Sequence, residues 1–271
     1  MKKRSSLLEN IYLGIILVFL YAPIVLLVFL SFTATSAKTS RTGSFTLEWY
    51  IRLFNNPVIM DALKTTLLIA VMAAVIATVV GTLAAIGLYG MKHGMRTAVL
   101  NVTYLPVINP DIVTGVSLMI LFTFMQMRLS FWTMLMAHLV FDIPYVILAV
   151  MPRLNKLDRS VYEAALDLGA TPGYALRKVI LPEIMPGVVT GLILAFTLSI
   201  DDFVISYFTS SDVQNLSMYI FSAARRGINP AMYSLMTLMF VTVLALLLIV
   251  NRRTARAADK AEAASRSIKS Y

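Results

Sequence analysis

Two adjacent carboxylates stand in the otherwise apolar segment SIDDFVISYF, at residues 199–208. A carboxylate costs roughly 2.5–3.5 kcal/mol to place at the centre of a membrane, so Asp201 and Asp202 each need a partner, water or a bound cation. Asp142 in LVFDIPYVIL and Asp111 in YLPVINPDIVTGV raise the same question. Carboxylates beside aromatic faces are suited to binding the ammonium groups of a cationic molecule.

The apolar runs around these carboxylates contain no Lys or Arg that could neutralise them. Arg128 lies at the edge of one run, and Arg225 and Arg226 lie in a connecting segment. An acidic cavity without a resident cation favours a cationic passenger over an anion. The predicted pathway residues are Asp111, Asp142, Tyr145, Asp201, Asp202, Phe203 and Tyr207.

Structural roles remain open for each of these carboxylates. Neighbouring helical residues point about 100° apart, so one member of the Asp201–Asp202 pair is expected to bond to Thr197 or Ser206 or to contact a partner subunit. Asp111 could be a helix-start charge, Asp142 could be protonated and buried, and the pair could be purely structural. His138, one turn before Asp142, is expected to be packed or hydrogen-bonded rather than a proton relay.

The elements that must position these residues are long apolar helices. The chain has 271 residues, 59% of them hydrophobic and 14% charged, and its apolar residues form unbroken runs. A helix of roughly 20 residues crosses a membrane, and runs without alternating polarity indicate helices rather than barrel strands. We therefore predict an all-α, polytopic membrane protein forming a single transmembrane domain over residues 1–271. The six predicted spans are 11–32, 65–90, 98–127, 129–151, 184–208 and 231–250.

Charge distribution predicts the orientation. Placing both termini in the cytoplasm puts most of the 23 Lys and Arg residues on the inner side, as the positive-inside rule requires. The net charge of +9 then comes from basic segments that lie beside acidic membrane lipid, and no nucleic-acid partner is needed to explain it. The first run contains Pro23 and no cleavage site, so we expect a retained helix. The tail, 251–271, has too little apolar content to fold alone and is predicted to be flexible.

The chain contains no cysteine, which excludes disulfides and thiolate metal sites. We predict no metal and no cofactor. The segment FTLEWYIRLF within the predicted loop 33–64 is expected to form a short interfacial helix, with Glu48 and Arg52 spaced i, i+4.

The third run is predicted to be broken. Pro106 and Pro110 interrupt it, and the backbone groups freed at such a break must face protein or a water-filled cavity. Asn109 as cap, Pro110 at the first helical position and Asp111 in the first turn would start a new helix there.

The longest predicted cytoplasmic loop, 152–183, is expected to hold two short helices. Asp158 or Ser160 would cap the first, which stops at Gly169. Thr171 would then cap a second helix, with Pro172 at its first position and Pro182 at its end. An apolar face on the first helix is predicted at Val161, Ala164, Ala165 and Leu168.

This loop contains a spaced motif formed by Glu163, Ala164, Ala165, Gly169, Leu181 and Pro182. The motif resembles the EAA loop of ABC importer permeases, with Val179 in the place of the usual Ile. Further segments, LEWYIRLF, NPDIV, DLGAT, RKVILPEIMPGV and FTLSIDDFVIS, resemble the inner-membrane permeases of the spermidine/putrescine (PotC-like) family over nearly the whole chain.

This resemblance implies the type I ABC importer permease fold in a bacterial cytoplasmic membrane. It also implies a heterodimer with a second homologous permease, two cytoplasmic ATP-binding subunits and an external polyamine-binding protein. The chain has no G-x-x-x-x-G-K-[ST] phosphate loop, so it is not expected to be an enzyme, and ATP hydrolysis is assigned to a partner.

The implied role of the EAA motif is mechanical coupling to the ATPase. A short helix seated in a cleft of the ATPase would move as that subunit closes. Gly169 would permit a sharp turn, and Glu163 would either pair with a basic partner residue or stabilise its own helix.

Other functions remain open at this stage. The same architecture could import ferric ion, thiamine or another cationic solute. A proton-coupled secondary transporter using Asp142 and His138 would need no ATPase but should show internal repeats, which the sequence lacks. A membrane scaffold would leave the broken third run unexplained.

Overall fold

The computed structural model describes residues 7–35, 42–226, 230–242 and 244. They fall into two compact units, one formed by residues 1–57 with 223–271 and the other by residues 58–222. Among the described residues, four helices are long and apolar enough to cross a membrane, or five if a sharply bent pair counts as one span. The predicted mostly helical membrane fold is therefore confirmed.

Two predictions fall wholly or partly beyond the described residues. The sixth predicted span, 231–250, is described as the apolar helix Ala231–Thr242, and the rest of that run lies outside. The tail 251–271 and the first six residues also lie outside, so the sixth span and the orientation of the termini stay predictions.

The unit that includes the N-terminal helix contains α1 (Leu7–Ser31), a two-stranded antiparallel hairpin and α2 (Glu48–Phe54). The strands are β1 (Thr33–Thr35) and β2 (Thr42–Phe45). Trp49 of α2 is buried and donates its indole N–H to the carbonyl of Thr33 at 2.9 Å. The predicted short helix is confirmed, including the Glu48–Arg52 ion pair at 2.6 Å.

The second apolar run forms the long helix α3 (Pro57–Gly90). The expected loop 33–64 and helix start at residue 65 were wrong, because eight further residues belong to this helix. Pro57 begins it, a position where the missing N–H of proline has no cost. Asp61 and Lys64, three residues apart on its first turns, form an exposed ion pair at 3.6 Å.

The third run is broken, as predicted. The axes of α4 (His93–Ile108) and α5 (Asp111–Phe124) differ by 104°. The predicted helix start is displaced by one residue: Asn109 ends α4, Pro110 is extended and precedes α5, and Asp111 is its first residue. Proline disfavours the helical conformation of the residue before it, and Asn109 is extended, with a ψ of 141°.

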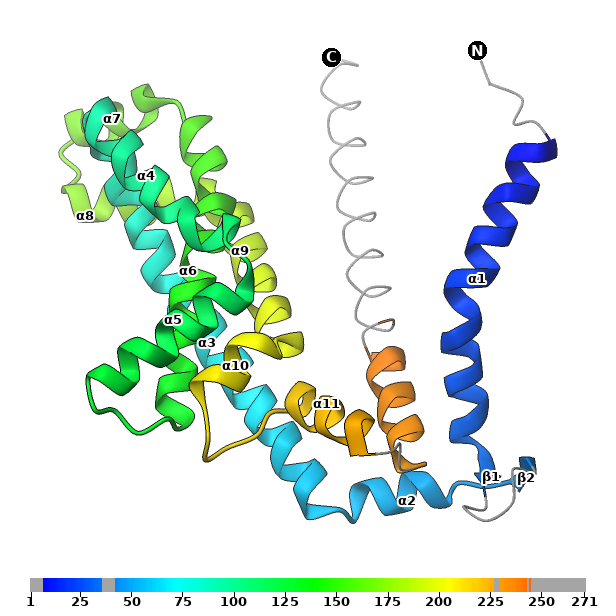
Figure 1. The fold of residues 1–271 in the computed structure, drawn as a ribbon. Coiled ribbons are helices and arrows are strands. Elements are labelled where there is room, and N and C mark those ends of the chain that lie inside the picture. The colour runs from blue at the N-terminus through cyan, green and yellow to red at the C-terminus, as the bar shows by residue number, and fades with distance from the viewer. Residues whose placement is uncertain (1–6, 36–41, 227–229, 243, 245–271) are drawn as a thin grey trace. The chain divides into compact units, whose positions relative to one another are not determined.

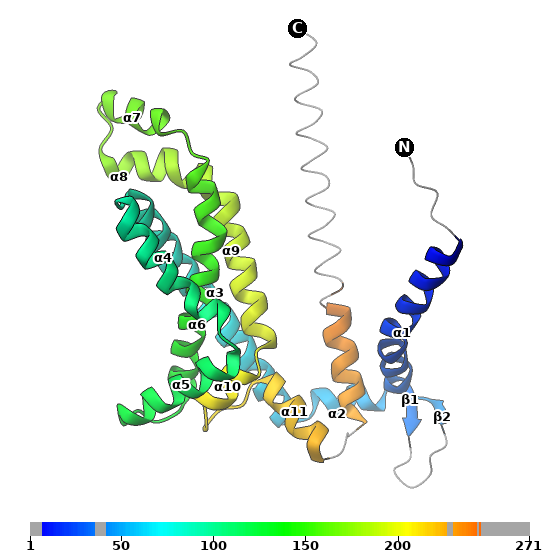
Figure 2. The same ribbon diagram turned by 45° about the horizontal axis from the view of Figure 1, so that its top comes forward.

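The core of the second unit is built by α3, α6 (Phe131–Asn155) and α9 (Leu181–Asp201), which run side by side in both views (Figures 1 and 2). Glycines allow the close approach of these helices. A Cβ added to Gly81 of α3 would lie 2.8 Å from the side chain of Val146, and one added to Gly187 of α9 would lie 2.9 Å from the carbonyl oxygen of Ala149. Small residues at helix crossings are typical of membrane helix packing.

The segment between α6 and α9 folds as two short helices, α7 (Arg159–Asp167) and α8 (Pro172–Ala175), at one end of these long helices. The expectation that Pro182 ends the second helix was wrong. A π-helical turn over Leu176–Ile180 follows α8, and α9 continues through Pro182. Pro182 is at the start of α9, where its missing donor is tolerated.

The fifth predicted span, 184–208, was also drawn too long. Helix α9 ends at Asp201, and a new helix, α10 (Val204–Thr209), begins after two intervening residues. Helix α11 (Leu216–Arg226) follows. The two adjacent carboxylates therefore lie at a break between helices and not within a continuous span.

We predict that Gly81→Ala destabilises the protein although alanine is the better helix former. The added methyl group must displace Val146, which costs about 1–3 kcal/mol by overpacking. Gly87→Ala, on the same helix with nothing within 4 Å of the new Cβ, should be neutral or slightly stabilising. Thermal unfolding of both variants in lipid nanodiscs measures the difference, and equal unfolding temperatures would contradict the close helix contact.

Candidate functional site

The carboxylate of Asp202 connects the end of α9 to the start of α10. The backbone of Asp202 is extended at the end of α9, and its carboxylate turns back to the start of α10. One oxygen accepts the N–H of Ile205 at 3.2 Å, and the other accepts the N–H and the hydroxyl of Ser206 at 2.8 and 2.7 Å. The expected bond from this acidic pair to Ser206 is confirmed for Asp202, whereas the hydroxyl of Thr197 bonds to the carbonyl of Ile193.

His138 of α6 lies buried between the two sides of this break. Its Nδ1 is 2.9 Å from the hydroxyl of Ser199 on α9, and its Nε2 is 3.0 Å from the hydroxyl of Ser206 on α10. The expectation of a hydrogen-bonded histidine is confirmed. The ring connects the last turn of α9 to the first turn of α10.

Asp142 lies at the far end of the same hydrogen-bonded chain. Its side chain is fully buried, and its Oδ2 accepts the hydroxyl of Ser199 at 2.7 Å. Its Oδ1 has no hydrogen-bond partner among the described residues. Asp142 and Asp202 are therefore joined through two serines and one histidine, all of them within the protein interior.

Asn215, just before α11, completes this network. Its side-chain nitrogen donates to the hydroxyl of Ser206 at 2.8 Å and to the carbonyl of Asp202 at 2.9 Å. Its side-chain oxygen accepts the N–H of Met218 at 2.8 Å, which fixes the orientation of the amide. Four segments of the chain thus meet at the α9–α10 break.

Asp201 differs from its neighbour because its side chain is exposed. An aromatic cluster adjoins it in sequence: the ring of Phe203 lies 5.4 Å from that of Tyr207 and 4.3 Å from that of Phe221. Tyr207 is 50% exposed. An exposed carboxylate can bind an ammonium group by ion pairing, and an exposed tyrosine ring can bind one by cation–π contact.

Asp111 is also exposed, at the first residue of α5. Helix α5 packs on α10 through Gly115, where an added Cβ would lie 3.2 Å from the ring of Phe208. Tyr145 is half-buried on α6, with its ring 5.3 Å from that of Phe141, and lies within electrostatic reach of both Asp111 and Asp142.

The structure thus separates the four predicted carboxylates into two kinds. Asp201 and Asp111 are exposed, whereas Asp142 and Asp202 are joined in the internal network. Ser206 was expected as a partner of the acidic pair, whereas the sequence reasoning missed Ser199 and Asn215 and did not place His138 between the two carboxylates. Among the residues that the structure describes, no three His, Asp or Glu side chains gather as a metal site would require.

The segment that contains the EAA motif has well-formed helix ends. The carboxylate of Asp158 accepts the N–H of Ser160 at 3.0 Å, and this bond holds the pKa of Asp158 below its ordinary value. Asp158, rather than Glu163, therefore caps α7. Thr171 caps α8 by accepting the N–H of Tyr174 at 3.4 Å, with Pro172 at the first position as predicted.

Gly169 makes the sharp turn between α7 and α8. Its φ of +87° lies in the left-handed region, which favours glycine. The N–H of Gly169 bonds to the carbonyl of Leu166 at 2.9 Å, and that of Ala170 to the carbonyl of Ala165 at 3.1 Å. This pair of bonds is the Schellman pattern that ends a helix.

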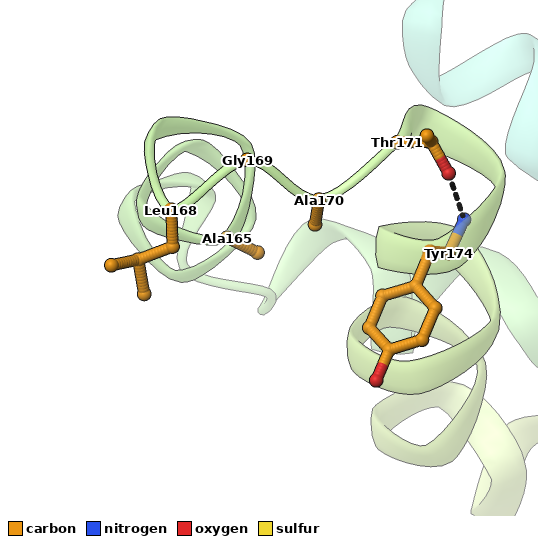
Figure 3. A pocket seen from close by; sticks show the side chains of 6 residues that line it. All are labelled: Ala165, Leu168, Gly169, Ala170, Thr171 and Tyr174. Carbon is orange, nitrogen blue, oxygen red and sulfur yellow. Dashed lines mark hydrogen bonds between the residues drawn. The ribbon is translucent and has the colours of Figure 1, made fainter.

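A shallow concavity of about 500 Å³ lies at this turn, lined by Ala165, Leu168, Gly169, Ala170, Thr171 and Tyr174 (Figure 3). Leu168 is 90% exposed, and Val161 on the same helix is also exposed. Tyr162 packs against the core of the unit instead. The predicted apolar face at Val161 and Leu168 is therefore directed outward, where another protein can contact it.

Comparison with known proteins identifies close relatives of this chain. Residues 77–260 match the family described as "Binding-protein-dependent transport system inner membrane component". The chain is 41% identical over 243 residues to the spermidine/putrescine transport system permease protein PotC of Haemophilus influenzae, covering 89% of this chain and 94% of the relative. It is 39% identical over 235 residues to the putrescine transport system permease protein PotI of Escherichia coli K12, covering 83% of each.

The fold also matches solved transporters. A bacterial ABC transporter involved in import of the acidic polysaccharide alginate matches with a TM-score of 0.67 at 19% identity, over 94% of this chain and 96% of the other. The MetNI methionine ABC transporter matches with a TM-score of 0.60 at 18% identity, over 74% of this chain and 95% of the other. At these identities the likeness concerns the fold.

We predict that Asp202→Ala lowers the stability of the protein by about 2 kcal/mol, because it removes a helix cap and leaves buried donors unpaired. Asp201→Ala serves as the matched control and should change stability by less than about 0.5 kcal/mol, since its side chain is exposed. Thermal unfolding of the full chain in nanodiscs measures both. Equal effects of the two substitutions would refute the assigned difference between the neighbours.

Proposed function

Because this chain belongs to the family of binding-protein-dependent transport system inner membrane components, we propose that it is the permease subunit of an ATP-driven importer for polyamines such as spermidine and putrescine. The family places it in the inner membrane as a transport component. Such membership argues against the secondary-transporter and scaffold alternatives.

The observation that carries the choice of polyamines is the near full-length similarity to the Haemophilus and Escherichia permeases, whose names specify spermidine and putrescine. The alginate and methionine transporters share the fold at much lower identity, so they do not favour another solute.

The exposed carboxylates give this proposal a physical basis. Aliphatic amines resemble lysine and are protonated at neutral pH. Asp201, at the end of α9, would pair with one ammonium group, while Phe203 and Tyr207 would contact the same cation through their ring faces. Asp111, on α5, would offer a second carboxylate to a transported polyamine with several ammonium groups.

Asp142 and Asp202 act differently in this proposal. Both oxygens of Asp202 and one oxygen of Asp142 accept hydrogen bonds from protein donors, so these two residues would hold the helices beside the pathway in position. Tyr145, half-buried on α6, would line the pathway on the α6 side.

We propose six membrane spans with both termini in the cytoplasm and a single transmembrane domain over the whole chain. A second homologous permease would complete the pathway, and an external binding protein would deliver the polyamine. ATP hydrolysis would take place on two cytoplasmic partner subunits.

The segment 152–183 is proposed as the contact with those ATPase subunits. Helix α7 presents exposed apolar side chains, and the turn at Gly169 holds α7 and α8 in a fixed relation. Glu163 is exposed on α7 and free to face a basic group of the partner. The residues proposed for coupling are Glu163, Ala164, Ala165, Gly169, Leu181 and Pro182.

Asp201→Asn should reduce uptake of labelled spermidine and putrescine about tenfold or more, because one charge-assisted contact with the cation is lost. Uptake is measured in proteoliposomes containing the complete transporter. Asp61→Asn, a change at an exposed surface carboxylate, is the control and should leave uptake unchanged. Undiminished uptake by the Asp201 variant would remove this residue from the pathway, and failure of the parent complex to transport either polyamine would refute the proposed cargo.

Gly169→Val should uncouple the transporter, because valine at a φ of +87° strains the backbone and displaces the end of α7. We expect uptake to fall severalfold, while binding-protein-stimulated ATP hydrolysis is lost or no longer follows transport. Gly173→Ala, where the added Cβ meets nothing within 4 Å, is the control. If the Gly169 variant kept normal transport-linked hydrolysis, the coupling role of this turn would be wrong.

A further inference from the structure

The hydrogen bonds around Ser206 determine the protonation of one side of the His138 ring. The Ser206 hydroxyl donates its only proton to the carboxylate of Asp202 at 2.7 Å and accepts a hydrogen from Asn215 at 2.8 Å. The remaining contact, 3.0 Å to Nε2 of His138, must then be donated by the ring. Nε2 therefore carries a hydrogen.

The hydrogen bonds on the Nδ1 side of the His138 ring can be arranged in two ways. In the first, Ser199 donates to an ionised Asp142 and accepts from Nδ1, so the ring is a doubly protonated imidazolium. In the second, a protonated Asp142 donates to Ser199, which donates to a bare Nδ1, so the ring is neutral. The bond lengths of 2.7 and 2.9 Å suit both.

Both arrangements contain the same number of protons. With a neutral ring and two ionised carboxylates the network would have a net charge of −2. One further proton, on His138 in the first arrangement and on Asp142 in the second, makes the net charge −1 in both. Losing that proton would leave two buried carboxylates without a counter-charge and break one of the serine bonds, which is costly in a low-dielectric interior.

The charged and titratable groups facing the ring are few. Asp142 comes from the same helix, and Asp202 comes from the α9–α10 break. Oδ2 of Asp202 lies 3.6 Å from Nε2 of His138. Asn215, just before α11, contributes a neutral amide, and Asp111 of α5 is exposed. The proton is therefore shared between His138 and Asp142.

We propose that His138 is a positioning residue of the pathway, which keeps one proton in the Asp142–Ser199–His138–Ser206–Asp202 chain and so fixes the α9–α10 break with the Asp201 carboxylate exposed. Only the role of His138 in transport rests on the proposed function. Without the ring, Ser199 and Ser206 lose their common partner, and the ends of the two helices are free to separate.

The first test observes the ring directly by ¹⁵N NMR of the full chain in nanodiscs, labelled at histidine and purified without a histidine tag. The chain has two histidines, so His93→Gln leaves His138 alone. We expect a protonated Nε2 at every pH at which the protein stays folded. A bare Nε2 would overturn the proposal.

The second test measures the rigidity of the break. The chain contains no cysteine, so Thr209→Cys places one thiol at a fully buried position of α10. Its maleimide labelling should be slow in the parent and about tenfold faster with His138→Ala, the change expected for loss of one hydrogen bond of ordinary strength. Unchanged labelling would contradict the positioning role.

His138→Gln provides the conservative rescue, because the glutamine amide has a donor group and an acceptor group, as the neutral ring does. Its labelling should lie closer to the parent than to His138→Ala, and polyamine uptake should follow the same order. His93→Gln should leave uptake unchanged. A Gln variant no better than Ala would count against positioning of the break by the hydrogen bonds of residue 138.

These tests separate the two proposals. The NMR and labelling experiments need no transported solute, so their failure would refute the role of His138 and leave the proposed function untouched. A parent complex that transports no polyamine would refute the proposed cargo and leave the proton assignment standing.

Discussion

The packing of α6, α9, α10 and the start of α11 depends on one carboxylate, that of Asp202, which accepts backbone hydrogen bonds. Asp202 accepts two backbone N–H groups and one hydroxyl at the point where α9 stops and α10 begins. A helix end in an apolar environment leaves donors that cost several kcal/mol if unpaired, and no water is available in the membrane core to satisfy them. The chain can break a helix here because it brings its own acceptor to the break.

The break has a direct consequence for the neighbouring residue. Asp202 turns inward to cap α10, whereas Asp201, the last residue of α9, keeps its side chain exposed. Two identical neighbouring residues therefore differ in environment, one hydrogen-bonded in the interior and one at the surface. His138 and Asn215 reinforce this division by joining α6 and the start of α11 to the same point.

Much of this arrangement could be predicted from local sequence, and the reason is that caps and proline breaks act over a few residues. Asp158, Thr171, Gly169 and the break before Asp111 were all found where short-range rules place them. The continuation of the helix through Pro182 was not, because the preceding π-helical turn has no short-range signature. The links from His138 to Ser199 and Ser206 join residues more than 60 positions apart, and apolar periodicity carries no information about such pairs.

The continuity of the segment Pro172–Asp201 also has a mechanical meaning. Its 30 residues form a rod of about 45 Å, with the Gly169 turn at one end and the acidic pair at the other. If such a rod rotates by about 5° around one end, its other end is displaced by roughly 4 Å. That distance exceeds the length of a hydrogen bond, so a small rocking movement at α7 and α8 would be sufficient to break or form side-chain contacts at the opposite end.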